Sequence, residues 1–293
     1  MTFIEYCTAM FKAGDLDPAF PMISEIIRRY ELSREQQYWL CFIYAATYHN
    51  ASMFLFQQEY PELSKVDIGR LQTWWDKNQT HFKVQATRNL NKDKFVQTVA
   101  SYKEIIGTGT QHDWLQKFVA RDAPRATFRN LFNGLCGPKA TYKVTGFGPY
   151  AVFAWLEALA RCAGVPLDCD EFRKTPPTNP RKGICSAFGL DYKTATDAQV
   201  DEVVEKVMTE LKQAGLPVDY FYIETLACAF QNRQREESDP KFRYVGYYLD
   251  RMYDEIKDGE TKMAAISTGV NWDTLWEMRR EIFPHKHLKE LPQ

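Results

Sequence analysis

Apolar residues recur at intervals of three and four positions along most of this chain, which is the period of an amphipathic α-helix. Segments 34–49, 65–78 and 94–106 follow this pattern. The alternation of apolar and polar residues that predicts a half-buried strand is hard to find. The pattern therefore predicts an all-α fold.

Capping residues and prolines at the ends of the predicted helices support the same prediction. Ser33 followed by Gln36 is a capping-box signal for the helix that starts at Arg34, and its apolar face is wide enough for a core helix. Pro149 stands at a permitted first-turn position of a helix over 149–163. Further helices are predicted over 197–215, 221–235, 241–259 and 271–283.

The organisation along the chain indicates one large helical domain over 1–293 with two intimate lobes. A proline-rich, basic segment over 173–183 is predicted to be a loop and to mark the lobe boundary. No segment reaches the roughly 20 apolar residues of a membrane span, and the N-terminus lacks the pattern of a signal peptide. We expect a cytoplasmic protein with no membrane partner, in the host cell cytoplasm if the protein is viral.

Composition narrows the possible chemistry. The seven cysteines are an odd number without a CxxC pair, which argues against a disulfide framework, and the five histidines are not spaced as metal ligands. We therefore expect no metal site built from His and Cys, and no cofactor. The spacing of these residues says nothing about Mg²⁺. The formal net charge is −1, so a nucleic-acid partner must be bound by a local basic patch.

The most basic window is 121–143, where five basic residues stand against one acid. The expected DNA-binding residues are in this window and in the turn Thr145-Gly146-Phe147-Gly148 that follows it: Arg125, Arg129, Lys139, Lys143, Gly146 and Gly148. A G-x-G turn that opens a helix can present backbone N–H groups to a DNA phosphate. The turn is expected to need glycine at 148 for a positive φ or for a close approach to phosphate.

This turn resembles the hairpin of helix-hairpin-helix DNA glycosylases. In those enzymes an aspartate follows the second glycine by a helix and a short turn, and Asp168 stands 20 residues after Gly148. The lyase members carry a catalytic lysine two residues after that glycine, where this chain has Tyr150. The alternative is a tight interhelical turn, with Asp168 or Asp170 capping the next helix.

Longer blocks resemble a second family. Segments 36–63, 70–102, 146–167, 179–191, 221–234 and 243–256 are together similar to the phage amino acid:DNA transferases, also called alpha-glutamyl/putrescinyl-thymine pyrophosphorylases, which hypermodify thymidine. The resemblance extends from about Arg34 to Ile256. No GxxxxGK[ST] loop is present, so a P-loop kinase is excluded.

The resemblance implies an all-α, helix-hairpin-helix DNA glycosylase-like architecture and a specific reaction. A thymine-like base in double-stranded DNA, derived from hydroxymethyluracil, carries a pyrophosphate ester on its 5-methylene group. The amine of a free amino acid such as glycine, or of a polyamine, displaces the pyrophosphate. Such a protein needs a carboxylate that accepts a proton, cations for pyrophosphate, an aromatic pocket for an extruded base and a surface that binds the DNA backbone. We expect it to act as a monomer.

Glu224 is the first candidate for the base, because a carboxylate inside the apolar segment 220–230 needs a function or a partner. Asp168 is the second candidate for the base, and Asp170 is a further candidate catalytic residue. The alternative for Glu224 is a structural ion pair with Arg251.

The candidate substrate-binding residues combine loop cations with aromatic and polar groups. They are Arg88, Lys92, Arg181, Lys182, Tyr150, Tyr247, Tyr248, Asp250, Arg251 and His49. The alternative for the cations is an ordinary solvated charge, and for His49 it is a core or cap role.

Two other functions stay open. A monofunctional base-excision glycosylase would use Asp168 to stabilise an oxocarbenium-like sugar. A noncatalytic DNA-binding module would retain the same fold without chemistry.

Overall fold

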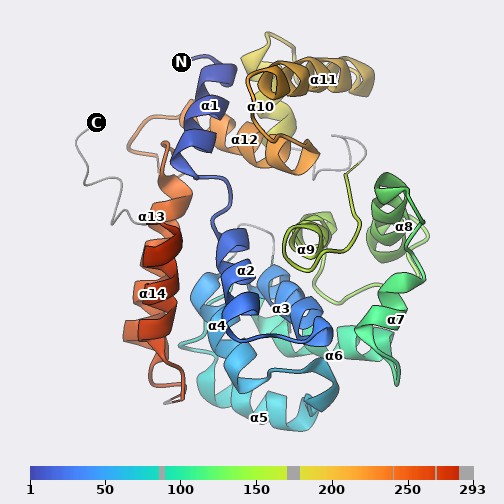
Figure 1. The fold of residues 1–293 in the computed structure, drawn as a ribbon, viewed down its shortest axis with the longest axis vertical. Coiled ribbons are helices and arrows are strands. Elements are labelled where there is room, and N and C mark those ends of the chain that lie inside the picture. The colour runs from blue at the N-terminus through green and yellow to red at the C-terminus, as the bar shows by residue number, and fades with distance from the viewer. Residues whose placement is uncertain (86–89, 170–178, 240, 268, 284–293) are drawn as a thin grey trace. The chain divides into compact units, whose positions relative to one another are not determined.

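A computed structural model of the chain describes residues 1–85, 90–169, 179–239, 241–267 and 269–283. Within these ranges every regular element is a helix, so the predicted all-α fold is confirmed for the described part of the chain (Figure 1). The helix-hairpin-helix architecture stays a prediction. None of the helices in these ranges is long and apolar enough to span a bilayer.

The chain divides into two compact units. Unit 1 contains Met1–Pro18 and Asp168–Arg251, and unit 2 contains Ala19–Leu167 and the described residues from Met252 onward. The predicted lobe boundary near 173–183 stays a prediction, and residues 173–178 lie outside the described ranges.

Unit 2 is built around two nearly fully buried helices, α3 (Arg34–Thr47) and α9 (Pro149–Cys162). The Ser33 capping box is present at the start of α3. The ring of Phe42 stacks on Tyr102 with centroids 3.9 Å apart and meets Trp155 edge-on at 5.4 Å. This aromatic contact fixes the position of α9 and of the turn before it.

The other helical elements of unit 2 surround this pair. They are α2 (Ala19–Arg29), α4 (Asn50–Glu59), η1 (Leu63–Lys65), α5 (Ile68–Asn78), η3 (Lys92–Lys94), α6 (Phe95–Ile106), α7 (Gln111–Gln116), α8 (Pro124–Cys136), the π-helical turn η5 (Gly259–Met263) and α14 (Trp272–Ile282). Helix α13 (Tyr247–Asp258) begins in unit 1 and ends in unit 2.

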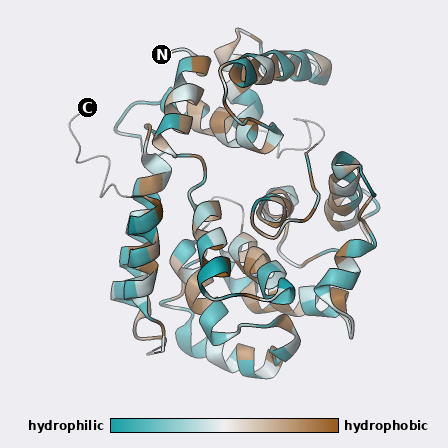
Figure 2. Cartoon of the chain, in the orientation of Figure 1, coloured by the Kyte–Doolittle hydropathy of each residue, from teal (hydrophilic) through white to brown (hydrophobic). Residues whose placement is uncertain are grey.

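Unit 1 consists of α1 (Phe3–Ala13), α10 (Asn179–Ala187), α11 (Asp197–Gln213), α12 (Tyr220–Arg233) and the start of α13. Helices α10 and α12 pack closely, because a Cβ at Gly183 would overlap the carbonyl oxygen of Ala227. Along α11, Figure 2 shows both hydrophilic and hydrophobic residues, as expected for a helix with one buried face.

Two predicted boundaries are wrong. Residues 179–183, with Arg181 and Lys182, were expected in a loop but form the start of α10. Pro180 is compatible with this helix because a proline in the first turn removes no intrahelical hydrogen bond. The predicted helix over 241–259 begins only at Tyr247, after Gly246, which has a φ of +105° that a regular helix does not allow.

Candidate functional site

The start of α13 gathers aromatic rings, cations and a buried carboxylate in unit 1. We call Arg243, Tyr244, Tyr247, Tyr248, Asp250 and Arg251 the tyrosine–arginine cluster. The sequence singled out four of these residues as substrate-binding candidates, Tyr247, Tyr248, Asp250 and Arg251, and all four lie in the first turns of α13. The tyrosines and arginines are half-buried, whereas Asp250 is only 2% exposed.

Contacts inside the cluster are of two kinds. The Arg243 guanidinium lies 3.8 Å from the ring centroid of Tyr247, and that of Arg251 lies 5.6 Å from the ring of Tyr248. The hydroxyl of Tyr244 donates a hydrogen bond of 2.7 Å to Oδ2 of Asp250. A guanidinium therefore lies over the face of each of two tyrosine rings in this cluster, and aromatic rings together with cations suit a flat base bearing an anionic group.

Asp15 anchors this cluster from the other end of the unit's sequence. Its Oδ2 accepts a hydrogen bond of 2.6 Å from the N–H of Gly246, and its Oδ1 accepts one of 2.9 Å from the N–H of Leu249. The side chain is fully buried. Both carboxylate oxygens are therefore used to hold the backbone at the start of α13.

Burial raises the pKa of Asp15 to about 7, against the lowering effect of the backbone N–H groups of Leu249, Gly246 and Tyr248. The charge of Asp250 raises the pKa of Asp15 further. Sequence reasoning missed Asp15, because an acid in the segment Gly14-Asp15-Leu16-Asp17 reads as an ordinary turn residue.

Glu224 lies on α12 of the same unit and is 1% exposed. The Thr225 hydroxyl lies 3.5 Å from Glu224 Oε2, at the limit of a hydrogen bond. Asp168 is half-buried and is the first residue of the second segment of unit 1. Asp170 lies outside the described residues, as does Arg88 of unit 2.

Two predicted cations of unit 1 are engaged by the protein itself. Arg181 donates from Nη1 to Asp197 at 2.6 Å and from Nη2 to the carbonyl oxygen of Ala195 at 2.5 Å. It therefore ties α10 to the start of α11. Lys182 lies with Nζ 5.2 Å from the ring centroid of Tyr192.

The predicted substrate-binding residues of unit 2 that the structure describes lie at the starts of three different helices: His49 at α4, Lys92 at η3 and Tyr150 at α9. His49 caps α4, since its Nδ1 accepts a hydrogen bond of 3.2 Å from the N–H of Ser52. This is the cap role that the sequence left open. Lys92 begins η3, and burial together with the charge of Lys83 lowers the pKa of its ammonium. Tyr150 is half-buried in the first turn of α9.

The expected DNA-binding residues lie on α8 and in the loop after it. Arg125 and Arg129 are exposed and four residues apart on α8, so they share a face. Lys139 and Lys143 are exposed in the following loop. The loop is anchored by Tyr142, whose ring meets those of Trp114 and Phe118 edge-on.

The turn before α9 is held by side chains of α6. The Ser101 hydroxyl accepts a hydrogen bond of 2.9 Å from the N–H of Thr145, and the Thr98 hydroxyl donates one of 2.8 Å to the carbonyl oxygen of Thr145. Phe147 stacks on Phe42 with centroids 5.2 Å apart. These contacts give the turn a fixed shape.

The two glycines of the turn have different roles, and of the two reasons expected for glycine at 148 the positive φ is absent. Gly146 has a φ of +82°, and a Cβ there would lie 3.0 Å from Oγ1 of Thr98. Gly148 has a φ of −92°, and apart from its own chain neighbours no atom of the protein lies within 4 Å of its Cβ position. The fold therefore needs glycine at 146, whereas it leaves open space at 148, beside the start of α9.

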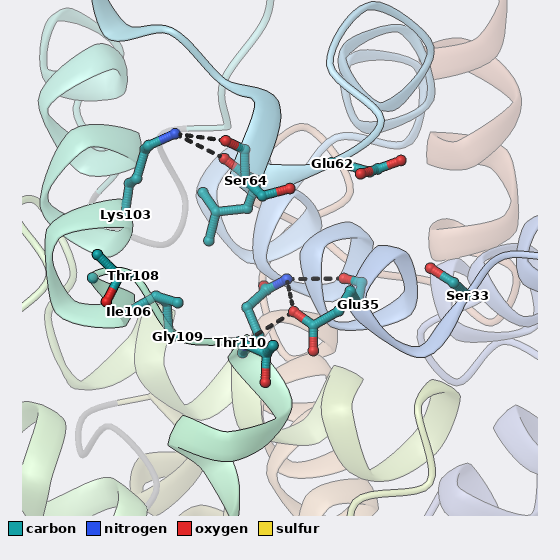
Figure 3. Close-up of a pocket in the computed structure, with 12 residues that line it drawn as sticks. Ser33, Glu35, Glu62, Ser64, Lys103, Ile106, Thr108, Gly109 and Thr110 are labelled. Atoms are coloured by element: carbon teal, nitrogen blue, oxygen red, sulfur yellow. Dashed lines mark hydrogen bonds between the residues drawn. The ribbon is translucent and has the colours of Figure 1, made fainter.

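A cavity of about 520 Å³ lies elsewhere in unit 2, between α3, η1 and the loop that joins α6 to α7 (Figure 3). Lys103 donates to the carbonyl oxygens of Leu63, Ser64 and Val66, and Glu35 accepts from the backbone N–H groups of Gln111 and His112. These two charged groups stabilise the walls. The cavity contains none of the predicted site residues.

No group of three His, Cys, Asp or Glu side chains converges as a metal site within the described ranges. A search of curated proteins finds no match to this chain. Residues 12–238, by contrast, match the protein family described as amino acid:DNA transferase. The match covers most of the sequence and confirms the family that the sequence blocks resemble: the chain belongs to the amino acid:DNA transferase family.

Proposed function

We propose that the protein transfers the amine of an amino acid or polyamine to a base in DNA that carries a 5-pyrophosphoryloxymethyl group, with release of pyrophosphate. Family membership supports an amino acid:DNA transferase in general terms. The observation that carries the finer proposal is the tyrosine–arginine cluster. The half-buried rings of Tyr247 and Tyr248, each with a guanidinium over it, suit a flipped base and the anionic leaving group attached to it.

The proposed step is a displacement at the methylene carbon on C5 of the base. The uncharged amine nitrogen forms a bond to this carbon, and the C–O bond to pyrophosphate breaks with its electron pair leaving on the pyrophosphate oxygen. The proton that the amine must lose passes to a carboxylate. Glu224 is proposed as this base and Asp168 as the second choice.

Different cations have different parts in the proposal. Arg251 and Arg243 are the first choices for the pyrophosphate, because their guanidinium groups lie over the rings of the cluster that is proposed to hold the base. The exposed arginines of α8 and the open backbone at Gly148 are proposed to contact the DNA backbone.

The test uses the purified full chain, double-stranded DNA containing pyrophosphorylated hydroxymethyluracil, and glycine, glutamate or putrescine in turn. The DNA is digested to nucleosides for mass analysis, and pyrophosphate is measured in parallel. We expect an amino-linked nucleoside with one of these amines and an equal amount of pyrophosphate. An abasic site would indicate the glycosylase instead, and unchanged DNA would indicate a noncatalytic module.

A pair of arginine variants tests the assigned place of the reaction. Arg251→Gln is expected to lower kcat/KM for the DNA by at least about tenfold, because it removes a charge-assisted contact to the leaving group. Arg280→Gln, at an exposed arginine on α14, is the matched control and is expected to leave kcat/KM unchanged. Equal activity of the two variants would move the pyrophosphate site away from the cluster.

A further inference from the structure

Asp15 of unit 1 is a fully buried acid, and both of its carboxylate oxygens accept hydrogen bonds from backbone N–H groups. A helix N-cap needs only one oxygen. The two bonds reach Gly246, where the backbone has a φ of +105°, and Leu249, in the first turn of α13. They enclose Tyr247 and Tyr248.

We propose that Asp15 is a positioning residue, which holds the start of α13 so that the tyrosine–arginine cluster presents its rings and cations to the modified base. The inference rests on the proposed function, since it takes the cluster as the base site. It goes beyond that function by naming a residue that touches no substrate and by making base binding depend on the ionisation of that residue.

The bonding geometry explains why an ionised carboxylate is needed. Oδ1 and Oδ2 accept from different N–H groups, 2.9 Å and 2.6 Å away. An amide or a protonated acid has only one strongly accepting oxygen, so one N–H loses its partner and faces another hydrogen donor. Either change should loosen the first turn of α13 and the rings attached to it.

The charged and titratable groups near Asp15 set the pH range in which its carboxyl group gains or loses a proton. The groups that act on Asp15 are Asp250 of α13, whose charge opposes ionisation, and the buried Tyr6 of α1, which in turn faces Arg233 of α12. Burial raises the pKa of the Tyr6 hydroxyl, so Tyr6 stays neutral near pH 7. Asp15 is thus the group that changes charge near neutral pH.

Hydrogen exchange of the intact protein tests the structural half of the proposal. At about pH 8, Asp15→Asn is expected to speed exchange of the Gly246 and Leu249 amides about tenfold or more over wild type, because a hydrogen bond to a charged acceptor is lost. At about pH 5.5 the two proteins should exchange alike. Asp67→Asn is the control, since Asn replaces Asp well at the exposed N-cap of α5.

The same experiment works on wild type alone if Asp15→Asn does not fold. Protection of the Gly246 and Leu249 amides should then rise with pH relative to the Arg70 amide, which Asp67 holds. The proposal is overturned if the Gly246 and Leu249 amides are equally protected in Asp15→Asn and wild type at pH 8. It is also overturned if their protection in wild type does not change with pH.

Binding of DNA that carries the pyrophosphorylated base, measured by fluorescence anisotropy without amine, tests the functional half. At about pH 8, Asp15→Asn is expected to bind about tenfold more weakly than wild type, with little difference at about pH 5.5. Tyr247→Ala is the reference that removes a ring of the cluster itself.

The reference separates two kinds of failure. Weak binding by Tyr247→Ala with normal binding by Asp15→Asn overturns the positioning role and leaves the proposed base site intact. Normal binding by both variants overturns the assignment of the base site to the cluster, and with it the inference. Protonation of the pyrophosphate group on the DNA would change the affinities of wild type and Asp15→Asn alike, so its effect cancels in the comparison.

Discussion

At the scale of single residues, burial decides which carboxylates are suited to proton transfer. Glu224 and Asp168 were both predicted from the sequence, and Glu224 is almost fully buried whereas Asp168 is half-buried. A carboxylate removed from water needs a partner or a function, and such groups occur preferentially at functional sites. This contrast favours Glu224 as the base.

The corresponding prediction compares Glu224→Gln with Asp168→Asn. Glu224→Gln is expected to lower the transfer rate by about 100-fold or more, because general base catalysis contributes on that order. Asp168→Asn is expected to have the smaller effect. Transfer rates are measured from pH 6 to 9 on variants whose folding is checked by circular dichroism, and wild-type rates for both would mean that another group or water accepts the proton.

The two glycines of the turn allow a second comparison at this scale. Gly146→Val should destabilise the protein by roughly 1–3 kcal/mol, because a β-branched residue is strained at a φ of +82°. Gly148→Ala should fold normally, since its Cβ would meet open space. If DNA approaches this turn, Gly148→Ala weakens DNA binding without a change in melting temperature, whereas unchanged binding contradicts a backbone contact there.

Residue-scale prediction from sequence succeeded for contacts between near neighbours and failed for distant ones. The tyrosine–arginine cluster is visible in the sequence because its members stand within nine positions of one another. Asp15 is not visible there, since its partner Gly246 is 231 positions away. No local pattern encodes such a contact.

At the scale of elements, long periodic helices were predictable and short or irregular ones were not. The predictions for α3, α5, α6, α9, α11, α12 and α14 agree with the structure to within a few residues. The pattern did not single out α1, α2, α4, α7 or α8, of which α7 has only six residues and so too few turns to display a period. The error at α10 arose because prolines suggest a loop even where the first turn accepts them.

Helix α8 carries the prediction about DNA binding. Replacing Arg125 and Arg129 together by Glu should weaken DNA binding and reduce the slope of log affinity against log salt by about 2, because each phosphate contact releases about 0.9 counterion. Affinity is measured by anisotropy at several salt concentrations. The charge-matched control is Lys206→Glu with Lys212→Glu, at two exposed lysines of α11.

Equal losses in the two double variants would mean that net charge alone governs binding and that α8 has no special part. A loss confined to the α8 variant supports the DNA contact in unit 2.

At the scale of the whole molecule, the contribution of Asp15 to the chain's stability and its proposed contribution to base binding should respond to pH in opposite directions. Ionised Asp15 holds both N–H groups at the start of α13, so base binding should improve as pH rises. Burial, however, raises the folded-state pKa of Asp15 from an ordinary value of 3.8 to about 7. The folded protein therefore binds this proton more tightly than the unfolded chain, and the contribution of Asp15 to stability falls as pH rises from about 4 to about 7.

This difference predicts a measurable effect of Asp15→Asn on the free energy of unfolding. Between about pH 5.5 and pH 8, the unfolding free energy of wild type should fall relative to that of the variant by about 2 kcal/mol, since each unit of pKa shift corresponds to about 1.4 kcal/mol. Other carboxylates titrate in both proteins, so their effects cancel in the difference. Urea unfolding of both proteins across this range provides the measurement. Parallel curves would show that Asp15 does not titrate there, and the start of α13 would then be held with equal strength at every pH at which the protein works.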